Sequence, residues 1–268
     1  MKIRAITGFF FIIVMLASVL LDHYVFGVFY LLLSGFALWE FYGLVKQAGI
    51  KPDKLTGLLN GAFIYIVFAL VTYNSDYHKL IFLLPITLSA VFIQELFKKH
   101  ASPFTNIAYT YLGLIFTIIP FTFFHALAYV GGTFNFHFPM AFLLLLWAND
   151  TGAYLVGSKF GRTKLFERHS PKKTWEGLIG GILITALAAY IISLYYTDIS
   201  LEHWIWIGVL ISCFGTTGDL IESMFKRSID VKDSGGILPG HGGLLDRFDG
   251  LLIAAPIVYA YLYFIVNS

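Results

Sequence analysis

The sequence predicts an all-α polytopic membrane protein with about nine transmembrane helices, its N-terminus in the cytoplasm and its C-terminus outside. Hydrophobic residues make up 58% of the 268 residues and charged residues only 13%, about half the ~25% of a soluble domain. The apolar runs are continuous and about 17–23 residues long, close to the ~20 residues that a spanning helix needs. A membrane barrel would instead show alternating strands of about 10 residues.

The apolar runs define the expected spans one after another along the chain. They cover residues 5–21, 24–45, 57–74, 79–97, 107–130, 138–157, 176–196, 203–225 and 249–266. The first run follows Lys2 and Arg4, as in a signal peptide. Because the second run begins after only Asp22 and His23, we expect a retained helical hairpin instead of a cleaved leader.

The basic residues set the predicted orientation, because lysine and arginine concentrate in cytoplasmic loops. With nine alternating spans and a cytoplasmic N-terminus, only Lys79 of the 18 basic residues falls outside. One span more or fewer would destroy this sorting. The pattern therefore favours a multi-pass protein of the cell (cytoplasmic) membrane.

Two predicted cytoplasmic segments, 158–175 and 226–248, are long, polar and contain glycine. Membrane residence alone does not require them, so we expect the chemistry there. This divides the chain into an N-terminal scaffold or lipid-cavity region, 1–137, and a C-terminal catalytic region, 138–268. The single cysteine, Cys213, excludes an internal disulfide.

One acid lies inside a predicted span. Asp150 is flanked by Asn149 and Thr151 within an apolar run, and an ionisable residue at such a position suggests function by default. A structural hydrogen bond to a neighbouring helix is the alternative. Gly152 and Gly157 would let a second helix approach closely.

A second group of polar residues ends the eighth span. Asp219, Glu222, Ser223 and Lys226 occupy positions i, i+3, i+4 and i+7, which places them on one helix face. A solvated helix end explains Lys226 and Arg227 well. It explains Asp219 poorly, because that acid lies about two turns inside the expected boundary, and for Glu222 the two interpretations stay open.

The segment between spans eight and nine holds five glycines within residues 235–243. Glycine backbones can approach a ligand closely, and their amide groups suit phosphate oxygens. Asp246 and Asp249 follow one turn apart at the start of span nine, where acids also complement the helix dipole. For His241 the alternative is that it is only a turn residue, and its spacing alone does not make it a catalytic base.

The other long segment contains Ser170, Pro171, Lys172, Lys173 and Thr174 in sequence. Proline after serine predicts a helix start with Ser170 as its cap. Two lysines and a threonine at a helix N-terminus would form an anion site, although ordinary cytoplasmic loop charge explains some of the lysines. Together with the carboxylates and the glycine segment, they describe metal-assisted phosphoryl or nucleotidyl transfer.

A longer motif resembles a known family. The matching residues are Ser223-Met-Phe-Lys226-Arg227, Lys232-Asp233 and Leu238-Pro239-Gly240-His241-Gly242-Gly243-Leu-Leu-Asp246-Arg247-Phe-Asp249. They resemble the complete signature of the phosphatidate cytidylyltransferases, also called CDP-diacylglycerol synthases. The Asn149-Asp150-Thr151 stretch and the segment 170–177 are similar to the family as well, whereas the N-terminal half matches only in architecture.

The resemblance implies a reaction of CTP with phosphatidate to give CDP-diacylglycerol and pyrophosphate, in phospholipid biosynthesis. It implies Mg²⁺ held by Asp219 and Asp246, with Asp249 and Asp150 as weaker candidates and a second cation left open. Asp219, Asp246, Lys226 and Lys173 are the expected catalytic residues. The expected substrate contacts are Lys172, Lys173, Thr174, Ser223, Lys226, Arg227, Lys232, Asp233, His241, Gly242, Gly243 and Arg247.

Two alternatives belong to other functional classes. A CTP-dependent lipid-alcohol kinase would transfer the γ-phosphoryl group and release CDP. A transporter of an anionic solute would show repeats and polar residues reachable from both sides, whereas polarity here gathers at one face. The expected partners are CTP, phosphatidate and membrane lipid, without nucleic acid, and a homodimer is left open.

Overall fold

The fold is a bundle of hydrophobic helices. The computed structural model describes residues 2–231, 235 and 242–266. Its elements are α1 (Lys2–Leu20), α2 (His23–Gln47), α3 (Lys54–Tyr73), the 3₁₀ segment η1 (Ser75–Leu83), α4 (Leu84–Leu96), α5 (Pro103–Gly113), the π-helical η2 (Leu114–Ile118), α6 (Ile119–Leu127), α7 (His137–Phe160), β1 (Lys164–Phe166), β2 (Ser170–Thr174), α8 (Trp175–Ser193), α9 (Leu201–Ser228) and α10 (Leu245–Val266).

Length and hydropathy make this a polytopic membrane protein. Among the described residues, eight helical segments are long and apolar enough to cross a membrane. Helix α1 adds a shorter apolar stretch, Thr7–Leu20. The predicted all-α polytopic fold is therefore confirmed. The helix boundaries differ from the predicted spans by a few residues. The difference that bears on the site is at α10, which begins at Leu245 and so includes Asp246 in its first turn.

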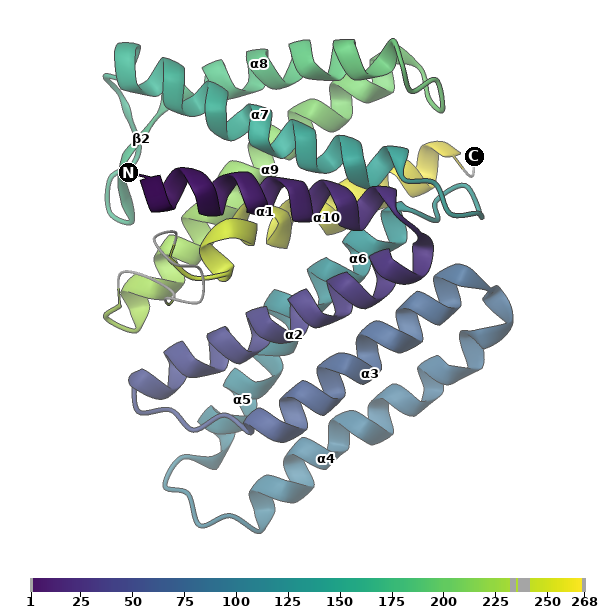
Figure 1. The fold of residues 1–268 in the computed structure, drawn as a ribbon. Helices are drawn as coiled ribbons and strands as arrows, with labels where there is room; N and C mark the ends of the chain where they lie inside the picture. Colours follow the sequence, from purple (N-terminus) through teal and green to yellow (C-terminus); the bar gives the residue numbers. More distant parts are fainter. Residues whose placement is uncertain (1, 232–234, 236–241, 267–268) are drawn as a thin grey trace.

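The helices run back and forth between two ends of the bundle (Figure 1). The N-terminus, the β1–β2 hairpin and the last turns of α9 lie at one end, and the C-terminus of α10 lies at the other. We call the first the basic end, because the hairpin lysines lie there. Lys79, in η1, follows the turn at the opposite end. This alternation agrees with the sorting of basic residues, and the membrane face that each end occupies stays a prediction.

The predicted loop 158–175 is partly a β-hairpin. Its strands β1 and β2 pair antiparallel, with Lys164 opposite Thr174. The prediction that Ser170 caps the next helix is wrong, because Ser170 belongs to β2. Pro171 disfavours the helical backbone in the residue before it. Thr174 is the actual cap of α8, and its Oγ1 accepts the Gly177 N–H at 3.2 Å.

The fifth hydrophobic segment is continuous but irregular, since α5 passes into α6 through the π-helical turn η2. The Ile119 N–H donates to the Leu114 carbonyl, five residues back. Pro120, which follows immediately, has no N–H of its own to donate. Turns of this kind accommodate a local mismatch in the helical hydrogen-bond ladder.

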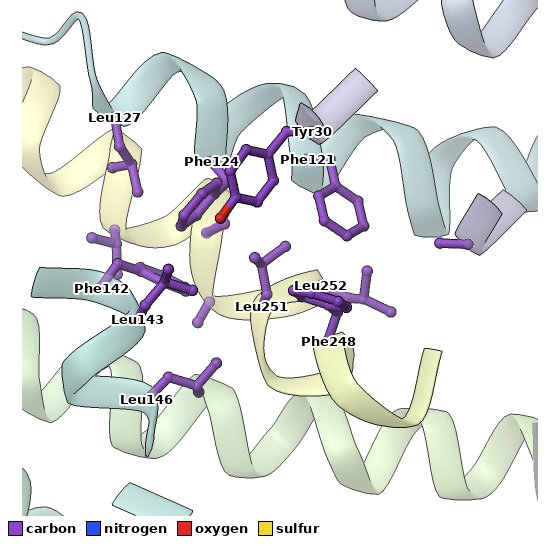
Figure 2. Close-up of a cluster of buried hydrophobic side chains, with 14 of the residues drawn as sticks. Tyr30, Phe121, Phe124, Leu127, Phe142, Leu143, Leu146, Phe248, Leu251 and Leu252 are labelled. Carbon is purple, nitrogen blue, oxygen red and sulfur yellow. The ribbon is translucent and has the colours of Figure 1, made fainter. Parts of the chain in front are cut away.

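One hydrophobic core runs through both halves of the chain. Its buried residues come from α1, α2, α3, α6 and all four helices from α7 to α10. Figure 2 shows the region where α2, α6, α7 and α10 meet. There Tyr30, Phe121, Phe124, Phe142 and Phe248 gather at 2% exposure or less. The division at residue 137 stays a prediction about chemistry, and packing continues across it.

Candidate active site

A cavity of about 510 Å³ opens between α7, α8, α9 and the β1–β2 hairpin. Its charged lining comes from three separate parts of the chain: Asp150 on α7, Lys172 and Lys173 on β2, and Asp219 on α9. Its full lining is Asn149, Asp150, Ala153, Tyr154, Gly157, Ser158, Leu165, Lys172, Lys173, Thr174, Gly177, Leu178, Thr216 and Asp219. The fold thus brings together residues that the sequence predicted for one site.

The hairpin carries the two lysines to the cavity and is tied to α8 in several places. The Trp175 N–H donates to the Thr163 carbonyl at 3.0 Å. The Glu176 carboxylate accepts the N–H groups of Arg162 and Thr163, each at 3.1 Å. These bonds fix the turn that precedes β1, and with it the strand pair on which Lys173 stands.

Glycine faces let α7 and α8 approach closely. A Cβ atom on Gly157 would lie 3.3 Å from the Cα of Gly177, and a Cβ atom on Gly180 would clash with the Val156 side chain. Small residues allow such contact between membrane helices. The expectation that Gly157 permits close approach is confirmed. The packing also presents Asn149 and Asp150 to the cavity beside α8.

Lys173 and Asp219 form the central ion pair of this cavity. The Lys173 Nζ lies 2.6 Å from the Asp219 Oδ2, and it also donates to the Thr216 carbonyl at 3.5 Å. Ser223, one turn further along α9, donates to the Asp219 Oδ1 at 3.3 Å. The predicted helix face on α9 therefore exists, and its first acid meets the hairpin lysine.

A second, more buried cluster lies at the start of α10. The Lys226 Nζ lies 2.5 Å from the Asp246 Oδ1 and 2.9 Å from the Glu222 Oε2. The Gly243 N–H donates to the Asp246 Oδ2 at 3.2 Å. Glu222 is only 1% exposed. Asp219 and Asp246 are thus each bound by a different lysine, in neighbouring clusters.

Close contact between α9 and α10 links these two clusters. A Cβ atom on Gly218 would clash with the Asp249 carbonyl oxygen. Asp219 follows Gly218 directly, so its backbone is held against α10. Asp150, Asp219 and Glu222 all lie near enough to Asp249 for their charges to interact with it. The Asp249 Oδ1 itself accepts the Gly250 N–H at 2.7 Å.

Several predicted substrate contacts lie away from the cavity or outside the described part of the chain. Arg227 is exposed and lines a separate hollow with Arg168 and His169. Arg247 is exposed on the first turn of α10, close enough to Asp150 for their charges to interact. Lys232, Asp233 and His241 lie outside the described residues.

The comparison with known proteins decides the family. The cytidylyltransferase family model matches residues 2–265. The chain belongs to the cytidylyltransferase family. It is also 35% identical to the phosphatidate cytidylyltransferase of Staphylococcus aureus (strain COL), over 96% of this chain and 97% of the relative. The phosphatidate cytidylyltransferase of Bacillus subtilis (strain 168) is 34% identical, over 97% of this chain and 96% of the relative.

The donor chemistry of this cytidylyltransferase suits a hard cation. Asp150 and Asp219 lie near enough to Asp249 for their charges to interact with it. All three supply carboxylate oxygens, and oxygen ligands suit Mg²⁺. The buried Asn149 Oδ1 has no hydrogen-bond partner. Within the described part of the chain, however, no three His, Cys, Asp or Glu side chains are grouped closely enough to hold a metal ion. The metal therefore stays a prediction based on ligand type.

One acid of the N-terminal half was not among the site residues predicted from the sequence. Glu40 lies on α2 at 6% exposure, and its Oε2 accepts the Leu245 N–H at 2.9 Å. The signal was available, because Glu40 interrupts an apolar run just as Asp150 does. The same argument from the cost of an intramembrane charge applies to both residues.

Proposed function

We propose that this cytidylyltransferase is a phosphatidate cytidylyltransferase. The observation that carries the proposal is the Lys173–Asp219 pair inside the cavity. It joins the segment 170–177, which resembles the family, to α9, the helix on which the longer motif begins. The relatives of that name match nearly the whole chain. The reaction consumes CTP and phosphatidate and yields CDP-diacylglycerol and pyrophosphate.

The chemistry needs charge neutralisation more than proton transfer. A phosphatidate oxygen attacks the α-phosphorus of CTP, the bond from that phosphorus to the bridging oxygen of the β-phosphate breaks, and pyrophosphate leaves. The attacking phosphate is already anionic at neutral pH, so no strong base is required. Lys172 and Lys173 line the cavity and would neutralise phosphate oxygens there. Lys226 and Arg227 are adjacent in the last turn of α9.

The acids are proposed to hold Mg²⁺, with Asp219 and Asp246 as principal ligands and Asp249 and Asp150 as weaker ones. A cation held by these acids would offset the charge of the reacting phosphate groups. A second cation is left open. The support is the density of acids. The charges of Asp150, Asp219 and Glu222 all interact with that of Asp249, and in the described structure Asp219 pairs with Lys173 and Glu222 with Lys226.

The nucleotide is proposed to lie along the glycine segment and the ends of α8 and α9. Its contacts would come from Thr174, Ser223, Lys232, Asp233, His241, Gly242, Gly243 and Arg247. Thr174 stands at the N-terminus of α8, where helix amides favour anions. Gly242 has a positive φ of 86°, a conformation that glycine adopts at little cost.

The lipid is proposed to enter sideways between helices. Tyr154, on the cavity rim, is 73% exposed, and Leu165 and Leu178 give the cavity an apolar wall. Phosphatidate could keep its tails among the exposed apolar side chains of α7 and α8 while its phosphate reached Lys173. We place the basic end on the cytoplasmic side of the cell membrane, because CTP is found in the cytoplasm. No nucleic-acid partner is expected, and a homodimer is left open.

The experiment is an assay of the purified protein in detergent with CTP and phosphatidate, with and without Mg²⁺. We expect pyrophosphate and CDP-diacylglycerol in equal amounts, only with both substrates and only with the metal. A lipid-alcohol kinase would instead release CDP when it is supplied with CTP and a lipid alcohol. A transporter would release neither pyrophosphate nor CDP. Formation of CDP without pyrophosphate would contradict the proposal.

A further inference from the structure

Glu40 is a buried acid on a helix that was predicted to be scaffold, and its burial costs free energy. It lies seven residues before the end of α2, with Phe41 fully buried beside it. A carboxylate at 6% exposure inside a membrane span is costly unless its oxygens are bound. Lys226 and Asp246 are near enough for their charges to interact with it. The position of Glu40 therefore needs an explanation beyond the packing of α2.

The contacts of Glu40 come from both sides of the glycine-rich segment. Its Oε2 accepts the Leu245 N–H at 2.9 Å, across 205 residues of sequence, and its carboxylate also bonds the Leu244 N–H. Its Oε1 has no hydrogen-bond partner among the described residues and packs against Gly235, where a Cβ atom would clash with it. One side chain thus touches the chain before and after residues 236–243.

These bonds act on the first turn of α10. The first N–H groups of a helix lack partners within the helix, and an anion there is favoured by the helix dipole. Glu40 provides that anion from another helix. Leu245 directly precedes Asp246, whose carboxylate meets Lys226 at 2.5 Å. Fixing the Leu245 backbone therefore fixes where the Asp246 side chain begins.

We infer that Glu40 is a positioning residue that holds the first turn of α10, and with it Asp246, in place. It acts through hydrogen bonds to backbone and does not itself touch the reacting atoms. The effect of Glu40 on catalysis rests on the proposed cytidylyl transfer, whereas its anchoring of α10 does not. The N-terminal region then contributes to the site, in addition to forming its walls.

The kinetic test compares Glu40→Gln with Glu40→Ala. Glutamine keeps an acceptor oxygen of the same reach, so kcat should stay within about threefold of the wild type. Alanine removes both bonds, so kcat per folded protein should fall roughly tenfold or more, as expected for a group that supports catalysis from a distance. Equal activity of the alanine variant and the wild type would overturn the inference.

Glu95 gives a matched control. It is a buried acid of the same region, at 3% exposure, bound to His100 at 2.8 Å and to Asn106 at 2.8 Å. Glu95→Ala should lower the melting temperature but leave kcat per folded protein unchanged. If Glu95→Ala lowered kcat as strongly as Glu40→Ala, the effect would be general destabilisation and the inference would be wrong.

Hydrogen–deuterium exchange gives a readout that does not need activity. In Glu40→Ala, amides 242–250 should exchange roughly tenfold faster than in wild type, whereas Glu40→Gln and Glu95→Ala should match wild type there. Unchanged exchange in Glu40→Ala would refute the anchoring, whatever the protein catalyses. If the wild type made no CDP-diacylglycerol, the proposed function would fail while this measurement still decided the role of Glu40.

A second variant keeps the inference testable if Glu40→Ala does not fold. Gly235→Ala leaves Glu40 in place but directs a methyl group at its Oε1. It should raise exchange over 242–250 and lower kcat in the same direction. Gly235→Ala with wild-type exchange and wild-type kcat would contradict the inference.

Discussion

At the scale of single residues, the two acids proposed as principal metal ligands are each paired with a lysine. Lys173 binds Asp219 and Lys226 binds Asp246. Each lysine offsets the cost of a carboxylate held inside the bundle. Each acid also places its lysine near the proposed phosphates. Removing either member of a pair should therefore affect both substrate binding and metal binding.

Asp219→Asn and Asp246→Asn should each lower kcat by roughly a hundredfold or more, with little loss of folded protein. Asparagine keeps the size but loses the charge that a hard cation needs, and such a cation is worth several kcal/mol in the transition state. The double variant should be scarcely worse than either single one, because residues that act as a unit are non-additive. Kinetics over a range of Mg²⁺ concentrations checks this.

Glu222→Gln is the control for these variants, since it lies on the same face of α9 and contacts Lys226. It should retain measurable activity. Normal turnover by Asp219→Asn at low Mg²⁺ would show that the acid is structural and that the metal lies elsewhere.

Lys173→Ala should lower kcat/KM for CTP about ten- to a hundredfold while the protein still folds. A charge-assisted hydrogen bond to phosphate is worth about 1.5–3 kcal/mol. Lys173 stands on the hairpin and is no part of the hydrophobic core. An unchanged kcat/KM would return Lys173 to the role of an ordinary cytoplasmic loop charge.

At the scale of elements, a polar joint outside the active site holds α3 at the basic end. Asp53 caps α3 by accepting the Thr56 N–H at 3.2 Å, and its Oδ2 lies 2.6 Å from the Lys98 Nζ. Burial alone would raise the pKa of Asp53. The hydrogen bonds from Lys98 and Thr56, with the Lys98 charge, outweigh burial and hold the pKa below its ordinary value of 3.8.

This joint predicts a pH dependence of stability. A depressed pKa means that the charged form stabilises the fold above pH 3.8, and that this contribution is lost as the pH falls through the folded-state pKa. Asp53→Asn should therefore melt at a lower temperature than wild type at pH 6, and the difference should shrink below about pH 4. A difference that stayed constant down to pH 3 would contradict this assignment.

The elements also show what local sequence can predict. Each apolar run of about 20 residues has one favourable state in lipid, so its helix was predictable. The β1–β2 hairpin was not, because it forms through pairing between Lys164 and Thr174, which hydropathy does not encode. For the same reason Ser170 was assigned as a cap when Thr174 holds that position.

At the scale of the whole molecule, the site depends on contacts between distant parts of the sequence. The acids on α7, α9 and α10 and the lysines on β2 and α9 were identifiable one by one, but their distribution between two lysine-centred clusters was not. Glu40 was missed because its partner, Leu245, lies 205 residues away. The sequence therefore predicted the residue types of the site better than their pairing.

Orientation in the membrane is a second property of the whole molecule. After Cys213 is replaced, a cysteine at Thr133 should react with an impermeant thiol reagent applied to sealed, right-side-out cells. One at Ser234 should react only after the membrane is opened. The reason is the concentration of basic residues at one end of the bundle. Equal labelling of both positions in sealed cells would contradict the nine-span topology.

The central claim is that cytidylyl transfer occurs at the cavity between α7, α8 and α9, and position-labelled CTP tests it most directly. With phosphatidate and Mg²⁺, α-³²P-labelled CTP should carry its label into the lipid product, and γ-³²P-labelled CTP should leave its label in pyrophosphate. Asp219→Asn should suppress both transfers together. Label from the γ-position in the lipid, or normal transfer by Asp219→Asn, would contradict the account.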